Sequence, residues 1–162
     1  MANYQVDLKA FGIAKETTRG TVVAAPTRDL WAARDSMLDF SLEHVDHDRL
    51  NSIVTGDLPP EAGRKVGKGK ITIDLEAQTI GEALYSVLGT YSGAQDSTTT
   101  AYTHTFTKTT STQHKSYTLF EYRGVDYFGY NLGVCKSLEV SVDAKGKGVA
   151  TQEWLFQNEQ TR

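Results

Sequence analysis

Regular alternation of apolar and polar residues is the feature that most constrains how this chain can fold. In the segment Met37–Val45, Leu38, Phe40 and Leu42 occupy one set of alternate positions, and mostly polar residues occupy the other. Successive side chains of a strand point to opposite faces, so this pattern predicts a strand with one buried face and one face in water. The segment Lys70–Ala77 alternates in the same way, and its expected inner face carries Ile71, Ile73, Leu75 and Ala77.

The rest of the chain also favours strands, because Thr, Val, Tyr and Ile recur between glycine-rich turns. Short turns are expected at Arg123-Gly124 and at Lys145–Gly148, and strands joined by short turns are antiparallel. The stretch Ser92–Thr100 is rich in Ser, Thr and Gly and predicts a loop. The further predicted strands are Gln5–Lys15, Arg28–Ala32, Tyr102–Thr109, Ser116–Tyr122, Val125–Val134, Lys136–Asp143 and Val149–Phe156.

One segment changes to a helical period. Thr79 and Glu82 have the spacing of a capping box, in which a threonine N-cap and a glutamate three positions later satisfy two backbone N–H groups. Gly89 is a natural stop for a helix. The apolar face of this predicted helix, about residues 79–89, comprises Ile80, Ala83, Leu84, Val87 and Leu88. The expected fold is mainly β, an antiparallel sandwich or barrel with one flanking α-helix.

The length of 162 residues fits a single domain, residues 1–162, with a sizeable core. The net charge of −3 argues against a protein that grips the phosphates of nucleic acid, which requires a basic face. No apolar run is long enough to span a membrane, and the N-terminus lacks the pattern of a signal peptide. The single cysteine, Cys135, excludes an internal disulfide and is expected to be a small buried apolar side chain.

No motif for enzymatic chemistry is present, since the chain has no phosphate-binding loop, GxSxG or HExxH. His44 and His47 form a metal-like cluster with Asp46 and Asp48, but positions three apart on a strand face opposite sides. We therefore expect no enzyme, no cofactor and no metal site. Aromatic residues gather in the second half of the chain, where core and interface packing is favoured over a stacking platform because no basic groove accompanies them.

The stretch Asp46–Lys68 has weak periodicity, several glycines, charges of both signs and the pair Pro59-Pro60. It predicts a long loop, and loops of this length in a compact domain are usually functional or disordered. One interpretation is a flexible surface loop. The other is an arm that becomes ordered against a neighbouring subunit, using its apolar residues Leu50, Ile53, Val54 and Leu58.

Acidic residues occupy the expected outer faces of three strands. Each pair alone is typical of a solvated face. If the strands share one sheet, that sheet has an acidic outer surface, which would repel phosphates and let DNA slide past. The residues concerned are Asp39, Glu43, Asp74, Glu76, Glu139 and Asp143.

Three segments together resemble the tail tube proteins of long-tailed, siphophage-like phages. The opening FGIAKETTRGTVVAAPT resembles their first strand and its Lys-Glu-Thr-x-x-Gly-Thr turn. The stretch RKVGKGKITIDLEAQTIGEALYSVLGTYS resembles their glycine-entered strand followed by a short helix. The stretch AYTHTFTKTTSTQHKSYTLFEY resembles their Tyr-x-His-x-Phe strand and the strand after it. The three segments occur in the family's order and cover most of residues 11 to 123.

The resemblance implies a structural subunit that forms hexameric rings, which stack into a tube for DNA ejection. It implies that the Asp46–Lys68 loop, including Arg64 and Lys65, contacts an adjacent subunit or ring, and that the acidic strands face the lumen. The implied partners are further copies of the chain and other tail proteins (tape measure, terminator and distal tail), with DNA passing without specific binding and no membrane. The implied location is the virion tail, and the host cytoplasm during assembly.

The chain ends sooner than many tube proteins of this kind. It fits a compact tube protein, and two alternatives to a tube protein stay open. One is a related ring protein, such as a tail terminator or a head–tail connector. The other is a monomeric β-sandwich that acts as a binding or decoration module, which predicts no rods.

Overall fold

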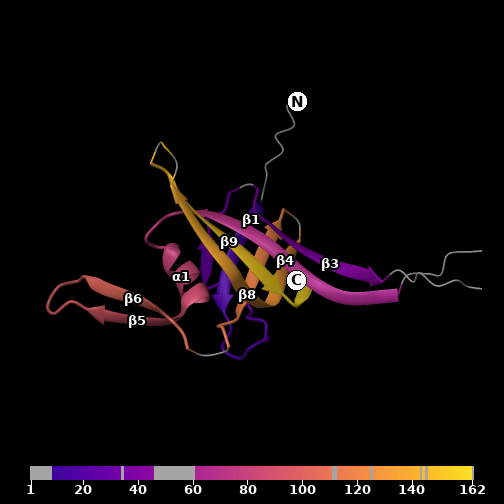
Figure 1. The fold of residues 1–162 in the computed structure, drawn as a ribbon, viewed down its shortest axis with the longest axis horizontal. Helices are drawn as coiled ribbons and strands as arrows, with labels where there is room; N and C mark the ends of the chain where they lie inside the picture. The colour runs from indigo at the N-terminus through magenta and orange to yellow at the C-terminus, as the bar shows by residue number, and fades with distance from the viewer. Residues whose placement is uncertain are drawn as a thin grey trace, which may run out of the picture.

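The computed structural model describes residues 9–33, 35–45, 61–110, 113–124, 126–142, 144 and 146–161. In this part of the chain the fold is mainly β with a single helix, as the alternation predicted (Figure 1). The elements in chain order are β1 (Lys9–Lys15), β2 (Arg28–Leu30), β3 (Met37–Val45), β4 (Glu61–Asp74), α1 (Ile80–Leu88), β5 (Gly89–Gln95), β6 (Tyr102–Lys108), β7 (Tyr117–Arg123), β8 (Tyr127–Val142), β9 (Gly148–Phe156) and β10 (Asn158–Thr161).

The strands form one large antiparallel sheet and one small one. The large sheet has the order β2-β1-β7-β8-β9-β4-β3, with β10 paired to β8, and the small sheet contains only β5 and β6. An antiparallel bridge between Ala32 and Ile73 brings the chain after β2 against β4. The large sheet therefore curls on itself, and its two end regions meet around one core.

Strand β8 makes this curvature possible. Its first half pairs with β7 and its second half with β9. Between the halves Leu132 has a φ of 54°, and the register shifts between Cys135 and Ser137. The prediction of two strands, Val125–Val134 and Lys136–Asp143, was wrong, because a bulge at Lys136 bends one continuous strand without ending its pairing.

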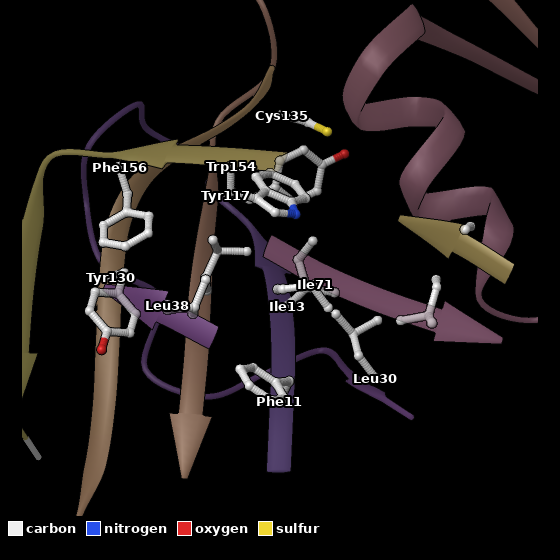
Figure 2. Close-up of a cluster of buried hydrophobic side chains, with 13 residues drawn as sticks. Phe11, Ile13, Leu30, Leu38, Ile71, Tyr117, Tyr130, Cys135, Trp154 and Phe156 are labelled. Atoms are coloured by element: carbon white, nitrogen blue, oxygen red, sulfur yellow. The ribbon is translucent and has the colours of Figure 1, made fainter. Parts of the chain in front are cut away.

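The core lies inside the curled sheet. Figure 2 shows Trp154 and Tyr117 packed together there, with ring centroids 5.7 Å apart in an edge-on arrangement. Core side chains from the neighbouring strands pack directly over Gly67 and Gly69 of β4. A Cβ atom at Gly67 would lie 2.1 Å from the ring of Phe156, and one at Gly69 would lie 2.2 Å from Leu38. Only glycine therefore lets these side chains cross the surface of β4.

Those glycines also explain the largest error in the sequence prediction. Strand β3 has the predicted bounds, but β4 begins at Glu61, so residues 61–68 of the predicted loop belong to a strand. The glycines hid its alternation. At its other end β4 stops at Asp74, so the expected inward positions of Leu75 and Ala77 are wrong, and Leu75 is 40% exposed. The remainder of the predicted loop, residues 46–60, lies outside the described residues.

The predicted helix is present, but its expected capping box is not. Thr79 is the N-cap, yet its hydroxyl donates to the carbonyls of Asp74 and Glu76 instead of capping the helix. Gly89 ends the helix as predicted, with a φ of 82°. The predicted loop Ser92–Thr100 is only partly correct: residues 92–95 belong to β5, which starts at Gly89, and residues 96–100 form the connection to β6.

Pairing with β6 makes this Ser/Gly-rich segment a strand, and the opposed rings of Tyr91 and Phe106 supply the contact that its own composition lacks. Figure 1 shows the resulting β5–β6 hairpin at one end of the longest axis, beside α1. The β3–β4 hairpin projects at the opposite end. The molecule therefore presents one hairpin at each end.

Candidate assembly surface

The predicted acidic strands do share one sheet. Strands β3, β4, β9 and β8 are neighbours, and directly opposed residues of antiparallel strands point to the same face. Asp39 opposes Lys68, Asp74 opposes Val149, and Glu139 opposes Thr151, which itself opposes a residue of β4 on the face of Asp74. Asp39, Asp74 and Glu139 therefore lie on the outer face of these four strands, where all three are exposed.

The other three predicted acids are not placed on this face. Glu76 is exposed but follows the end of β4. Glu43 belongs to β3, in a part of that strand where only the backbone is described. Asp143 lies outside the described residues.

The same face also carries lysines, which the sequence reasoning left out. Lys68 and Lys70 occupy outward positions of β4, and Lys68 lies directly opposite Asp39. The Nζ of Lys136 lies 3.4 Å from the carboxylate of Glu153, and the Nζ of Lys147 lies 2.9 Å from that of Asp74. A hydrogen bond from Ser137 and the nearby Lys136 lower the pKa of Glu153. The face therefore carries both charges side by side, and exposed pairs of this kind contribute little to stability.

The residues predicted for inter-subunit contact are only partly described. Leu50, Ile53, Val54 and Leu58 lie outside the described residues. Arg64 and Lys65 are part of β4 instead of a loop, and the side chain of Lys65 is exposed.

A buried ion cluster holds β3 against the opposite end of the sheet. Glu121 on β7 is fully buried, and Arg123 contacts its carboxylate at 2.8 Å while the Nζ of Lys9 lies 3.6 Å away. Both cations also donate to carbonyls at the β3 edge, Arg123 to Leu38 at 2.8 Å and Lys9 to Ser36 at 3.1 Å. The hydrogen bond with Glu121 raises the pKa of Arg123. The cluster therefore joins β1 and β7 to β3, which are distant in strand order.

Glu16, within the turn that follows β1, is a second buried carboxylate. Its oxygens accept hydrogen bonds from the backbone N–H of Gly20 at 2.7 Å, the backbone N–H of Leu132 at 2.8 Å and the hydroxyl of Thr118 at 3.2 Å. It ties the Glu16–Gly20 turn to β7 and to the bend of β8. Its spacing to Gly20 was visible in the sequence, but its partners 100 residues away were not.

A hollow of about 650 Å³ lies where α1, the β5–β6 hairpin and the start of β2 meet. Its walls carry aromatic rings together with one cation and one carboxylate. The residues that define it here are Arg28, Glu82, Tyr85, Tyr91, His104 and Phe106. Lys15 borders it, because its Nζ donates to the hydroxyl of Tyr85 at 3.0 Å and lies over that ring.

An aromatic ladder continues from this hollow along one face of the hairpin. The ring of Tyr91 contacts Phe106 at 5.2 Å and stacks on His104 at 5.8 Å, and His104 stacks on Tyr102. Tyr91 and His104 are also hydrogen-bonded, at 2.9 Å between the hydroxyl oxygen and Nδ1. Tyr91 is 45% and Tyr102 60% exposed. The ladder is thus a large aromatic surface in water, and the sequence signalled it only as alternation in Tyr102–Thr109.

Cys135 is buried, as expected, and burial raises the pKa of its thiol to about 11. Among the described residues no group of three His, Cys, Asp or Glu side chains is placed to hold a metal ion. His44 and its neighbours in the HVDHD stretch have no described side chains. The one helix of the described part, α1, has nine residues and is too short to cross a membrane.

No protein-family model matches the chain, and no curated protein matches its sequence. Its structure is similar to that of a chain in the cryo-EM structure of the anti-feeding prophage (AFP) baseplate, 6-fold symmetrised. The match has a TM-score of 0.58 at 13% sequence identity, and it covers 95% of this chain and 91% of that chain. The fold of this chain is therefore similar, over nearly its whole length, to that of a chain in that baseplate structure.

Proposed function

We propose that this protein is a structural, non-enzymatic subunit of a phage tail, which assembles into hexameric rings that stack into the tube through which DNA leaves the virion. The observation that carries this proposal is the fold likeness, over nearly the whole length of both chains, to a chain of a 6-fold symmetrised prophage baseplate. The ordered resemblance of three segments to tail tube proteins supports the more specific role.

The edges of the sheet fit assembly into a closed ring. Strand β3 is the last strand of the large sheet, so one of its sides has no neighbouring strand in the described part of the chain. Unpaired strand edges favour pairing with another chain, and a closed ring removes the edge of every subunit at once. In this proposal the outer face of β3, β4, β9 and β8 lines the lumen.

The charges of that face fit a channel that DNA passes without being held. Asp39, Asp74, Glu139 and Glu153 on this face balance Lys68, Lys70, Lys136 and Lys147. These residues therefore give the face no net positive charge with which to hold phosphates. We propose that Glu43, Glu76 and Asp143, which the sequence grouped with these acids, also face the lumen.

The proposal also assigns a role to the end of the β3–β4 hairpin. Leu50, Ile53, Val54 and Leu58, with Arg64 and Lys65, would contact an adjacent subunit or ring. Other tail proteins would cap and join the tube at its ends.

A related ring protein is the second candidate, and the same fold likeness favours it, since the matched chain belongs to a baseplate. Electron microscopy of the purified protein at high concentration, with size-exclusion chromatography in parallel, separates the two. A tube subunit is expected to form long hollow rods, and a ring protein to form single rings with a central pore. A strict monomer at all concentrations, which also stays monomeric with purified tail-tip complexes, would contradict both candidates.

A further inference from the structure

We infer that the aromatic hollow between α1 and the β5–β6 hairpin is the receptor for residues 46–60 of a second copy of this chain. The inference rests on the self-assembly in the proposed function and names the surface through which one copy recognises the next. The β5–β6 hairpin leaves one aromatic face exposed to water.

An isolated two-stranded hairpin is at best marginally stable in water, and it needs a further strand or a packed helix. Helix α1 covers only the inner end of this one, where Tyr85 contacts Tyr91 at 6.0 Å. Farther out, Tyr91, His104 and Tyr102 stay exposed. Gly93 keeps this surface flat, because a Cβ atom there would lie 2.6 Å from the hydroxyl of Tyr91. The arrangement fits an extended apolar segment laid against rings.

Residues 46–60 of the chain, DHDRLNSIVTGDLPP, have the matching chemistry. Leu50, Ile53, Val54 and Leu58 are apolar, and the adjacent Pro59 and Pro60 are residues that aromatic-lined grooves accept. Three aspartates and one arginine give the segment a net charge of −2 with histidine neutral. The hollow is bordered by two cations, Arg28 and Lys15, against one carboxylate, Glu82. The charges are therefore complementary.

The position of this segment in the chain shows why a second copy must supply it. The segment is attached at Val45 and Glu61, the outer end of the β3–β4 hairpin. The hollow lies at the other end of β4, whose 14 residues span about 45 Å as a strand. A segment of 15 residues that leaves and returns to one place reaches outward only about 25 Å. It is therefore too short to reach the hollow of its own copy, and Figure 1 shows the two hairpins at opposite ends.

Such a contact joins one end of a copy to the opposite end of the next. It is therefore a heterologous interface, which generates closed rings or open filaments and not symmetric dimers. The hollow is then the acceptor half of the interface, and the hairpin end is the donor half.

The test is a titration of the isotope-labelled full chain, at a concentration where it is monomeric, with a synthetic peptide of residues 46–60, followed by NMR. We expect chemical-shift changes confined to α1, β5 and β6. Tyr91→Ala should weaken binding at least tenfold, whereas Leu155→Ala, an exposed apolar residue on the outer sheet face, should leave it unchanged. A peptide with Leu50, Ile53, Val54 and Leu58 all changed to serine should not bind, and this control leaves the protein unaltered.

Absence of binding at millimolar peptide, or shifts that map to the outer face of β3 and β9, would overturn the inference. Electron microscopy of the same preparation keeps the two proposals separate. Rods or rings without peptide binding would contradict the acceptor site and leave the proposed function standing. Peptide binding without rods or rings would support the acceptor site and count against the tube.

Discussion

The two hairpins at the ends of the molecule differ in how they are held. In the β3–β4 hairpin, β4 pairs on both sides, and Leu38, Ile71 and Ile73 are buried in the core. In the β5–β6 hairpin the two strands pair only with each other within the described residues, and one face of aromatic rings is exposed. The first is part of the body, and the second is an appendage carried by α1.

This difference indicates where rigidity and adaptability lie. Segments with buried apolar contacts open only with the whole domain, whereas segments with few such contacts open locally at low free energy. The β3–β4 hairpin is therefore held rigidly by the core, so it can present a subunit contact in a fixed orientation. The β5–β6 hairpin has few such contacts, so we expect a bound partner to make it more rigid. Four substitution experiments can test this contrast.

Truncating the core residue that β4 packs around should loosen the first hairpin with the whole body. Trp154 is 1% exposed and lies opposite Gly69 of β4. We expect Trp154→Ala to lower the free energy of unfolding by about 3–5 kcal/mol, measured by denaturant unfolding. Trp31 is 77% exposed, so Trp31→Ala is the matched control and should change stability by under about 0.5 kcal/mol. Equal effects of the two variants would show that the core assignment is wrong.

Breaking the buried ion cluster should release the β3 edge specifically. Glu121→Gln keeps the shape of the side chain but removes the charge that faces Arg123 and Lys9. We expect a loss of about 2 kcal/mol, below that of a fully buried pair because both cations stay partly hydrated. Amide hydrogen exchange should become faster at residues 37–41 of β3, with a smaller change in β9. The control is Glu153→Gln, which removes an exposed ion pair and should leave exchange in β3 unchanged.

Cys135 tests whether α1, which carries the second hairpin, detaches on its own, because Ser86 of that helix is a hydrogen-bond neighbour of its thiol. The pKa of its thiol is raised by burial to about 11 in the folded protein, against 9.0 for a free thiol. Between these values the unfolded chain releases a proton that the folded protein keeps. Stability is therefore unaffected by this group below pH 9, and it falls as pH rises to about 11, by at most about 1.4 kcal/mol per pH unit.

The alkylation rate of Cys135 should follow global unfolding in denaturant, and Cys135→Ser should remove this thiol's share of the alkaline loss. Alkylation much faster than global unfolding would mean that α1 opens together with the β5–β6 hairpin, and the boundary of the appendage would move to include the helix.

Removing the central ring of the ladder should affect only the appendage. Tyr91→Ala loses ring contacts with Tyr85, Phe106 and His104, none of which is fully buried, so we expect a change in global stability under about 1 kcal/mol. Amide exchange in β5 and β6 should rise at least tenfold. Tyr91→Phe keeps the ring and loses only the hydrogen bond to His104, so its effect should be smaller. A large global loss from Tyr91→Ala would show that this hairpin belongs to the cooperative core.

Sequence patterns predicted elements with one continuous apolar face better than strands whose packing depends on other elements. The bounds of β3 and the position of α1 followed from periods of 2 and 3.6, because each element buries one continuous apolar face. The first half of β4 was missed because Gly67 and Gly69 stand where side chains from β9 and β3 cross the strand. Strand β5 was missed because its stabilising contacts come from β6. The aromatic hollow was missed for the same reason, since its rings come from α1 and both strands of the hairpin.

The charged outer face separates what local sequence patterns predict from what depends on the packing of distant strands. Local spacing and side-chain polarity were enough to predict the alternation, the outward positions of Asp39, Asp74 and Glu139, the helix with its glycine stop, and a buried cysteine. Three features became visible only in the folded chain: lysines lie among those acids, Glu121 joins β7 to β3, and a hollow lies at the end of the molecule opposite the β3–β4 hairpin. Those features depend on which distant strands become neighbours, and that is determined by the packing of the whole core.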